Sequence, residues 1–379
     1  MDDVVIVGGG PAGTTAAIVL ARAGARVRIV DRSAFPRDKL CGDTVNPGTL
    51  AELERLGAAA AVHERGRQVD GMTVTGEHGV VIEGRYPRGL CGRAILRRDL
   101  DAILLEQAIA AGAAFEPRVA VRGALVDDRR GRRSVMGVVA GASGTPIRAT
   151  VTIAADGRRS TIGFGLGAAR HPPRPRRWAV GAYFDGVAGT GALGEMHVRR
   201  GRYIGIAPVP GGLTNVCLVL PSGAGDRRLG DPASLMTGAL AADALLAPRF
   251  VPARLATPPV VLGPLATDVR AIDLDGLLFA GDAAGFIDPM TGDGLRFAIR
   301  GGVLAAHAAR QALEHGWAGV HGALASARRR EFAGKQRFNR ALRSLVSSPR
   351  GIVVAAIGAR FAPSVLRAVI ARAGDCDLA

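Results

Sequence analysis

The sequence predicts an α/β fold of two domains organised around a parallel β-sheet. With 379 residues, of which 48% are hydrophobic and 22% charged, the chain is long enough for two hydrophobic cores and has a globular composition. Short apolar runs at residues 4–7, 151–154 and 277–280 have the length of strands buried on both faces of such a sheet. Each run leads into a glycine-containing turn, and the first turn continues into a helix. Residues 66–86 and 176–261 alternate short strands with turns, which predicts a second sheet.

The positive charge of the chain comes almost entirely from arginine. The formal net charge is +16, yet lysine occurs only at Lys39 and Lys335. Aromatic residues make up only 4% of the chain, and it carries no recognised nucleic-acid-binding motif. We therefore expect the arginines to serve phosphate-bearing cofactors and expect no nucleic-acid partner.

The cysteines, the histidines and the hydrophobic runs exclude several other classes of protein. The four cysteines are far apart and the seven histidines form no cluster, so we expect neither a disulfide framework nor a metal site. A structured motif begins at residue 3, and no run reaches the ~18 to 20 apolar residues of a membrane-spanning helix. We expect a cytoplasmic protein without a signal peptide or a transmembrane segment.

The stretch VVIVGGGPAGTTAAIVLARAGARVRIVDR predicts a strand, a glycine turn, a helix and a second strand. In the G-x-G-x-x-G turn, Gly8 allows the tight bend, Gly10 lets the backbone approach a pyrophosphate, and Gly13 lets the helix pack closely on the sheet. The helix N-terminus offers free N–H groups to phosphate. Asp31, at the end of the second strand, can accept hydrogen bonds from ribose hydroxyls. The residues expected at this dinucleotide site, for either NAD or FAD, are Gly8, Gly10, Pro11, Ala12, Gly13, Asp31 and Arg32.

A second glycine motif late in the chain indicates which dinucleotide is bound. Residues 277–302 read LLFAGDAAGFIDPMTGDGLRFAIRGG, which predicts a strand, a Gly281-Asp282 turn, a loop and a helix. This arrangement resembles the FAD-binding oxidoreductases of the glutathione-reductase-like superfamily. The resemblance implies that Asp282 accepts a hydrogen bond from a ribityl hydroxyl of FAD. It also implies that the Gly292-Asp293-Gly294 turn, preceded by Pro289, brings a helix N-terminus to the flavin pyrimidine ring.

Two segments between these motifs resemble the same superfamily. Arg97 and Asp101 form an R-x-x-x-D pattern at a helix start, which resembles the arginine that contacts the FAD phosphates; alternatively, Arg97 is a solvated charge at a helix start. Asp156-Gly157, after the strand at 151–154, resembles a motif of flavin monooxygenases that supports FAD and visiting NAD(P)H. The alternative is a simple turn between strands.

The loop FPRDKLCGDTVNPG at residues 35–48 narrows the resemblance further. The pattern F-P-R-D-K-x-C-G is similar to the geranylgeranyl-reductase-like branch of these flavoproteins, which includes isoprenoid double-bond reductases, menaquinone-tail reductases and polyketide hydroxylases. The resemblance implies that Lys39, Cys41 and Gly42 lie beside the flavin. Cys41 is either a flavin-contacting thiol or a chemical participant. Asp43 is either a proton donor or an ordinary loop acid.

The chain departs from two relatives in its middle segment. Flavin halogenases carry W-x-W-x-I-P and an essential lysine, and neither is present, because Trp178 and Trp317 are isolated. Isoprenoid reductases tend to carry Y-x-W-x-F-P, of which this chain keeps Tyr203 and Pro208. Tyr183, Tyr203 and Pro208 are the candidates for an apolar substrate pocket, together with Phe184, although such residues often belong to the core.

The resemblance gives a fold and a domain plan. We expect a glutathione-reductase-like Rossmann FAD-binding domain with an inserted β-sheet substrate domain and a helical C-terminal part. The predicted FAD domain comprises residues 1–65, 90–170 and 265–315, the substrate domain 66–89 and 171–264, and the helical part 316–379. The last part is either a helical pair packed on the FAD domain or a lid that touches the membrane surface.

The expected activity is that of an NAD(P)H-linked, FAD-dependent oxidoreductase. The favoured interpretation is a monooxygenase that hydroxylates a lipophilic aromatic or polyketide-like molecule through a flavin C4a-hydroperoxide. The alternative is a reductase of isoprenoid double bonds, with Cys41 or Asp43 giving the proton. A minor alternative is a non-redox, flavin-containing cyclase. NAD(P)H would be a transient reductant, because the chain has no second strand–turn–helix unit of the first kind.

Overall fold

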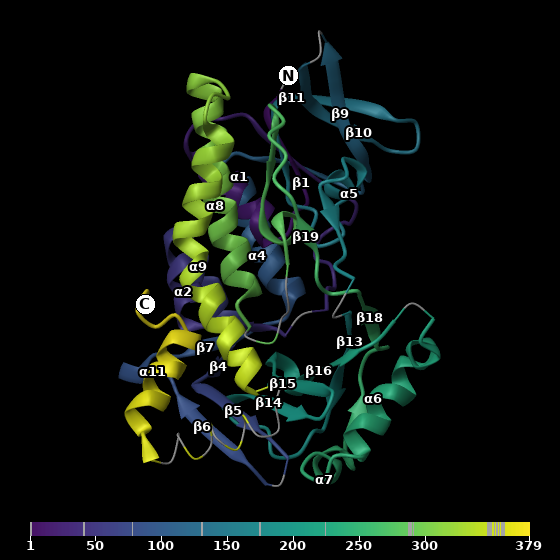
Figure 1. The fold of residues 1–379 in the computed structure, drawn as a ribbon, viewed down its shortest axis with the longest axis vertical. Coiled ribbons are helices and arrows are strands. Elements are labelled where there is room, and N and C mark those ends of the chain that lie inside the picture. The colour runs from purple at the N-terminus through teal and green to yellow at the C-terminus, as the bar shows by residue number, and fades with distance from the viewer. Residues whose placement is uncertain are drawn as a thin grey trace.

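The computed structural model describes residues 2–379 except 41, 78, 130–131, 174–175, 224, 287–289, 291, 347–350, 352, 354, 356 and 358–360. Two sheets dominate the fold (Figure 1). A largely parallel sheet with long helices beside it occupies one half, and a second, mostly antiparallel sheet with shorter helices occupies the other. The predicted fold class is confirmed.

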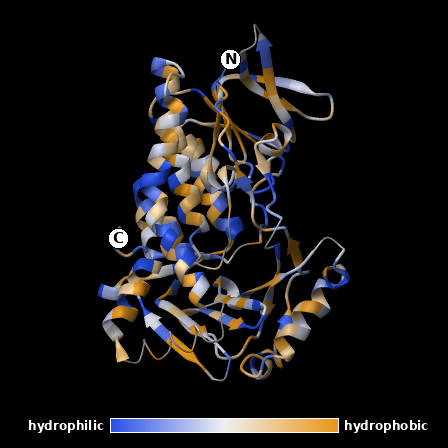
Figure 2. Ribbon diagram, viewed as in Figure 1, coloured by the Kyte–Doolittle hydropathy of each residue, from blue (hydrophilic) through white to orange (hydrophobic). Residues whose placement is uncertain are grey.

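The first sheet contains the strands that the apolar runs predicted. β1 (Asp2–Val7) lies between β2 (Val27–Asp31) and β11 (Thr145–Ala154), and all three run parallel. β8 (Ala114–Pro117) extends the sheet beyond β2, and β20 (Leu277–Phe279) pairs in parallel with β11. Figure 2 shows these central strands as mainly hydrophobic, as expected for a sheet covered on both faces. The antiparallel hairpin of β9 (Val121–Arg129) and β10 (Arg132–Ala140), which joins this sheet through β11, had not been predicted.

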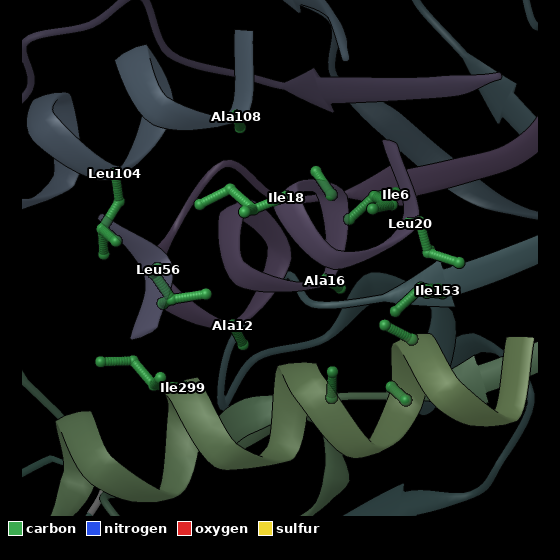
Figure 3. Packing of buried hydrophobic residues seen from close by; sticks show 14 of the residues in the cluster. Ile6, Ala12, Ala16, Ile18, Leu20, Leu56, Leu104, Ala108, Ile153 and Ile299 are labelled. Carbon is green, nitrogen blue, oxygen red and sulfur yellow. The ribbon is translucent and has the colours of Figure 1, made fainter. Parts of the chain in front are cut away.

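Close helix packing places the glycine turn. α1 (Pro11–Arg22) lies between α8 (Gly294–His315) and α4 (Arg97–Ala110), as Figure 3 shows with Ala12 and Ile18 of α1 between Ile299 and Leu104. A Cβ atom on Gly302 of α8 would collide with the carbonyl oxygen of Ala12. The first turn of α1 and the helix that follows residue 293 are thereby held side by side.

The second sheet is mostly antiparallel. Its order is β17 (Arg254–Leu255), β13 (Arg177–Asp185), β16 (Leu213–Pro221), β15 (Arg202–Pro208), β14 (Leu193–Arg199), β5 (Gly71–Thr75) and β6 (Val81–Arg85), and β18 (Val260–Leu262) also pairs with β13. One face packs on α6 (Pro232–Ala241) and α7 (Ala247–Phe250), and the other is turned to the loops of the first half. These strands lie inside the ranges predicted for the substrate domain, whose boundaries stay a prediction.

Short elements connect the two halves. A three-stranded sheet is formed by β3 (Thr44–Val45), β7 (Gly92–Ala94) and β4 (Arg67–Val69), and β12 (Ala169–Arg170) pairs with β19 (Asp268–Val269). The remaining short helices are α2 (Pro47–Leu56), α3 (Ala59–Arg65) and α5 (Thr161–Gly165). β3 and α2 hold the chain that directly follows Asp43.

The last part of the chain is helical. α9 (Val320–Val346) lies along α8, and α11 (Pro363–Ala373) follows near the second sheet (Figure 1). Within the described part of the chain, no helix is both long and apolar enough to cross a membrane.

Candidate active site

The glycine turn leaves an open helix N-terminus. Gly8 has φ +106°, and a Cβ atom there would collide with the carbonyl oxygen of Ala155, while one on Gly13 would collide with the carbonyl oxygen of Gly8. Gly10 is the N-cap of α1, and no side chain caps the helix or places an acid in its first turn. The free backbone N–H groups of the first turn, which start at Ala12 because Pro11 has none, therefore have room and a favourable dipole for a phosphate oxygen.

Asp31 fixes this turn from the end of β2. Its Oδ2 accepts a hydrogen bond from the backbone N–H of Gly9 (2.8 Å), and its Oδ1 accepts one from Ser33 (2.8 Å). The carboxylate is 8% exposed, whereas its neighbour Arg32 is exposed. Asp31 thus lies beside the turn, and the ribose contact expected of it stays a prediction.

Two arginines and one aspartate form a buried cluster beside the turn. Arg97 forms a bidentate ion pair with Asp101 (2.8–3.0 Å), and Nη2 of Arg37 lies 3.2 Å from the same carboxylate. The Arg37 guanidinium lies over the ring of Phe35, and its Nη2 is 3.6 Å from the point that a Cβ atom on Gly10 would occupy. One carboxylate faces two guanidinium groups, so a positive charge is left at the start of α1.

Arg37 was not among the predicted cofactor residues. The available signal was its position in the F-P-R-D-K pattern, two residues before Lys39. Its place beside Gly10 follows from the fold of the loop around Phe35 and α4.

Lys39 and Asp282 are two oppositely charged side chains that are largely surrounded by protein. Burial lowers the pKa of Lys39, with Arg97 acting in the same direction and Asp101 and Asp282 opposing it. Burial raises the pKa of Asp282, with Lys39, Arg97 and Arg158 opposing it. Yet Lys39 is exposed and Asp282 is partly exposed. Both side chains are therefore surrounded by protein yet reach solvent, and Asp282 lines the cavity described below.

The Asp156-Gly157 turn lies against the first glycine of this motif. The Cα atom of Asp156 is 3.1 Å from the point that a Cβ atom on Gly8 would occupy. Oδ2 of Asp156 accepts a hydrogen bond from the backbone N–H of Thr161 (2.7 Å), and burial raises the pKa of this carboxyl group. Gly157 has φ +82° with open space around it. The two motifs are therefore brought together.

The late glycine motif reaches the same region. Gly281 packs against the side chain of Ala12, and α8 begins at Gly294 after Gly292, which has φ +70°. Asp293 is the N-cap residue of α8, but its side chain makes no capping hydrogen bond. Gly42 is exposed, with open space around it. Cys41 and Pro289 lie outside the described residues.

A cavity of about 90 Å³ adjoins the late motif. Gly281, Asp282, Asp293 and Gly294 line one side, and residues of α9 such as Asn339 line the other. It shares Gly285, Phe286, Arg328, Phe332 and Gln336 with a more open groove of about 820 Å³. That groove is also lined by Arg170, Arg270 and Arg329.

Asp43 is the buried acid of the second half of the site. It is 0% exposed, and its φ of +51° lies in the left-handed region, which is strained for residues other than glycine. Its Oδ2 accepts hydrogen bonds from the hydroxyl of Tyr183 (2.5 Å) and from Nδ2 of Asn215 (2.6 Å). Burial raises the pKa of Asp43 to about 6, opposed by these two hydrogen bonds and by Arg97.

The geometry of this network assigns the place of the proton. Both donors point at Oδ2, whereas Oδ1 makes no hydrogen bond. Two donors at Oδ2 favour Oδ1 as the oxygen that carries the proton when Asp43 is protonated, and the backbone of Arg97 also acts on this carboxyl group. Tyr183 of β13 and Asn215 of β16 are direct cross-strand partners, so the sheet fixes both donors. Asn215 had not been predicted; the available signal was a single amide in the apolar strand LTNVCLVLP.

The pleat of the second sheet divides the predicted pocket residues. Tyr183 lies on the face turned to Asp43, and Tyr203 packs on that side with Met290 and Leu265. Pro208 shares the alternation of Ile204 and Ile206, which pack toward α6, so the pleat places it on the opposite face. Phe184 also faces that way, edge-on to Phe250. Strand residues of opposite parity point to opposite faces, so Pro208 lies on the other face from Tyr203, and its assignment to the pocket stays a prediction.

Comparison with known protein families identifies the family of this chain. Residues 1–340 match the family model described as an FAD binding domain. The protein belongs to this family of FAD-binding oxidoreductases. As an enzyme of the family it takes FAD as its cofactor, and the residues present fit that group. The uncapped α1 N-terminus and Arg37 suit a pyrophosphate, and the recessed Lys39 and Asp282 suit polar groups of the cofactor.

Relatives in this FAD-binding family are named as reductases and as a monooxygenase. Menaquinone reductase of Mycolicibacterium smegmatis is 30% identical over 80% of this chain and 75% of its own. Digeranylgeranylglycerophospholipid reductase 2 of Methanopyrus kandleri is 30% identical over 82% of this chain and 78% of its own. The 6-methylpretetramide 4-monooxygenase of Streptomyces rimosus is 35% identical over 42% of this chain and 39% of its own.

Solved structures with the same fold include flavin-dependent halogenases. The brominase Bmp2 aligns with a TM-score of 0.85 at 20% identity, covering 99% of this chain and 94% of that chain. The halogenase CmlS aligns with a TM-score of 0.77 at 24% identity, covering 89% of this chain. This chain spans only 63% of the CmlS chain. At these identities the likeness establishes the fold alone.

Proposed function

We propose that this FAD enzyme is an NAD(P)H-linked reductase of a carbon–carbon double bond in a lipophilic, isoprenoid-type small molecule. The observation that carries the proposal is Asp43, a buried acid with a pKa near neutrality, held by Tyr183 and Asn215 on the inner sheet face. Two relatives that match four-fifths of the chain are named as a menaquinone reductase and a digeranylgeranylglycerophospholipid reductase. This order reverses the expectation from the sequence, which favoured hydroxylation.

Reduction of a double bond needs a hydride on one carbon and a proton on the other. FAD, when bound and reduced by NAD(P)H, supplies the hydride. The protein must supply the proton, and an acid with a pKa near the working pH is suited to do so. Asp43 is such an acid, and Oδ1 is the oxygen favoured to carry its proton.

The hydrogen bonds at Oδ2 support the second half of this step. After Asp43 gives up its proton, the carboxylate is buried and must be stabilised by donors. The Tyr183 hydroxyl and the Asn215 amide are already in place to do this. Arg97 adds a further favourable charge for the anion. Reprotonation from solvent then restores the acid for the next cycle.

Product analysis without oxygen tests this function. Purified enzyme, FAD and NADPH or NADH are incubated anaerobically with menaquinone or a geranylgeranyl lipid. The proposal expects a product that has gained two hydrogen atoms, in an amount that matches the oxidised nicotinamide. Turnover that requires oxygen, or that proceeds without any nicotinamide, contradicts it.

Hydroxylation is the second candidate, and one observation favours it. The match to 6-methylpretetramide 4-monooxygenase has the higher identity, 35%, although it covers only 42% of this chain. In the same assay, a hydroxylase would need oxygen, and its product from a polycyclic aromatic substrate would gain one oxygen atom.

A lipophilic substrate also gives a role to an exposed apolar surface. Val353, Ile357, Phe361 and Val365 are spaced four residues apart and are 39–79% exposed, with Phe361 the most exposed of them. Arg367 follows on α11. Exposed apolar side chains in a part of the chain that also carries an exposed cation suit the surface of an anionic bilayer. We include peripheral contact with such a bilayer in the proposal.

Vesicle co-sedimentation tests that contact. Phe361→Ser with Val365→Ser is expected to abolish binding to vesicles that contain phosphatidylglycerol. Val251→Ser removes an equally exposed apolar side chain, 83% exposed, at another place and serves as the matched control. If the double variant sediments with the vesicles like the unmodified protein, Phe361 and Val365 do not contact the bilayer.

A further inference from the structure

Lys335 is a fully buried cation on α9. It is 1% exposed and is one of only two lysines in the chain. Its Nζ forms ion pairs with Asp293 (3.1 Å) and Asp375 (3.0 Å). It also donates hydrogen bonds to the backbone carbonyls of Arg372 (2.6 Å) and Ala373 (2.9 Å). Four oxygens from two separate segments therefore converge on one ammonium group.

The first of these segments is the Gly292–Gly294 turn at the start of α8. Asp293 is the N-cap residue of that helix, but its carboxylate is drawn toward α9. Its Oδ2 accepts a hydrogen bond from Nδ2 of Asn339 (2.7 Å), a second residue of α9. Asp293 also lines the cavity that Asp282 lines. Lys335 thus holds, through its ion pair with Asp293, the turn that the sequence predicts beside the flavin.

The second segment, residues 372–376, also packs on the loop that carries Asp43. The backbone N–H of Gly48 donates to the carbonyl of Gly374 (3.0 Å), and a Cβ atom on Gly48 would collide with Asp375. Nδ2 of Asn46 donates to the carbonyl of Ala373 (3.4 Å). Asp375 has φ +50°, a strained conformation that needs support from its surroundings.

We propose that Lys335 is a positioning residue for FAD, which joins the Gly292–Gly294 turn and the loop at residues 43–48 through the segment 372–376. Both joined elements lie at the predicted flavin site. Lys335 does not itself need to touch FAD. The inference goes beyond the reductase proposal, because it holds for any reaction that uses the bound flavin.

Charge balance explains why a lysine is needed there. Burial and the neighbouring Asp375 raise the pKa of Asp293, whereas Lys335 lowers it. Without the ammonium group, the buried carboxylates of Asp293 and Asp375 lose their shared cation, and the Gly292–Gly294 turn loses its ion pair with α9. The other titratable or charged groups around this pair are Arg296, Tyr86 and Cys376.

Flavin titration of Lys335→Met at pH 6 and pH 8 tests the proposal. We expect FAD affinity to fall roughly tenfold or more at pH 8, because one partner of a buried charge cluster is removed. We expect the loss to be smaller at pH 6 than at pH 8, because removal of Lys335 takes away a charge that lowers the pKa of Asp293, and the lower pH favours the uncharged carboxyl group. In Lys335→Met with Asp375→Asn the charges balance again, and affinity should return toward that of the unmodified protein with less dependence on pH.

Two controls keep the result interpretable. Arg310→Met removes an exposed cation from α8 and should leave FAD affinity unchanged. If Lys335→Met does not fold, Lys335→Arg replaces it, because a planar guanidinium cannot bring one nitrogen to all four oxygens, and a several-fold weaker affinity is expected. The proposal is overturned if Lys335→Met binds FAD within twofold of the unmodified protein at both pH values. It is equally overturned if Lys335→Arg, used in its place, binds FAD within twofold of the unmodified protein. Flavin binding is read directly, so a failure here is separate from a failure of the reductase assay.

Discussion

The hydroxyl of Tyr183 donates a 2.5 Å hydrogen bond to Oδ2 of Asp43, a residue 140 positions away in the chain. The bond joins the second sheet to the loop that follows β2 and precedes α2. Asn215, the cross-strand partner of Tyr183, donates to the same oxygen. A buried carboxyl group whose two donors come from a rigid sheet is well suited to proton transfer.

Removal of the Tyr183 hydroxyl is expected to shift the pH profile. The hydrogen bond from Tyr183 lowers the pKa of Asp43, so Tyr183→Phe raises that pKa above its value of about 6. A proton donor is active below its pKa, so the fall of kcat/KM with rising pH should move to higher pH. Initial rates from pH 5 to pH 9 measure it. Tyr203→Phe removes a hydroxyl elsewhere on this sheet and should leave the midpoint in place.

Asp43→Asn is expected to stabilise the fold above pH 7. The pKa of Asp43 is raised from 3.8 to about 6 in the folded protein. Its stabilising contribution is thus present below pH 3.8 and is lost as the pH rises through 6. The shift of about two pKa units corresponds to roughly 3 kcal/mol. Asparagine mimics the protonated acid and tolerates a positive φ.

Thermal unfolding at pH 5 and pH 8 measures this effect. The gain from Asp43→Asn should be larger at pH 8 than at pH 5, because Asp43 is mostly protonated at the lower pH. An equal change in melting temperature at both pH values would show that the titration of Asp43 does not contribute.

Arg37→Gln is expected to weaken FAD binding about tenfold, the usual scale for one charge-assisted contact to phosphate. Its guanidinium lies beside Gly10, where the predicted pyrophosphate approaches the backbone. Isothermal titration with FAD measures the affinity. Arg26→Gln removes an exposed arginine whose ion pair with Asp3 is on the surface, and it is the matched control. Equal affinity of the two variants would remove Arg37 from the cofactor site.

Gly302→Ala is expected to destabilise the protein by about 1–3 kcal/mol, the typical cost of overpacking. The added methyl group collides with the carbonyl oxygen of Ala12 and forces α8 away from α1. Gly322→Ala in α9 meets no atom within 4 Å and should stabilise by up to about 1 kcal/mol. Denaturant unfolding of the two variants should therefore show opposite signs.

The FAD-binding half of the fold is largely predictable because its signals are local. Gly8, Gly10 and Gly13 each answer a steric demand within one strand–turn–helix unit, and the strands at 4–7 and 277–279 form as the apolar runs predict. The hairpin β9–β10 carries charged residues along an exposed edge and offers no such pattern.

The acid network and the buried lysine depend on long-range packing. Asp43 meets both Tyr183 and Asn215 only because β13 and β16 pair in this register, and a shift of one strand by one residue would turn one of the two side chains away. Lys335 meets Asp293 and Asp375 only after α9 and α11 are docked. Pro208 lies on the same strand as Tyr203 but on the opposite face of the sheet, and only the register of β15 shows which of the two is turned toward Asp43.

The rate at which substrate reoxidises the reduced enzyme tests the central claim most directly. Unmodified protein and Asp43→Asn are loaded with FAD, reduced anaerobically with NADPH and mixed with menaquinone or a geranylgeranyl lipid. The account predicts equal rates of flavin reduction and a reoxidation rate that is about a hundredfold or more lower in Asp43→Asn, the usual scale for losing a general acid. Equal reoxidation rates in the two proteins would contradict the assignment of Asp43 as the proton donor.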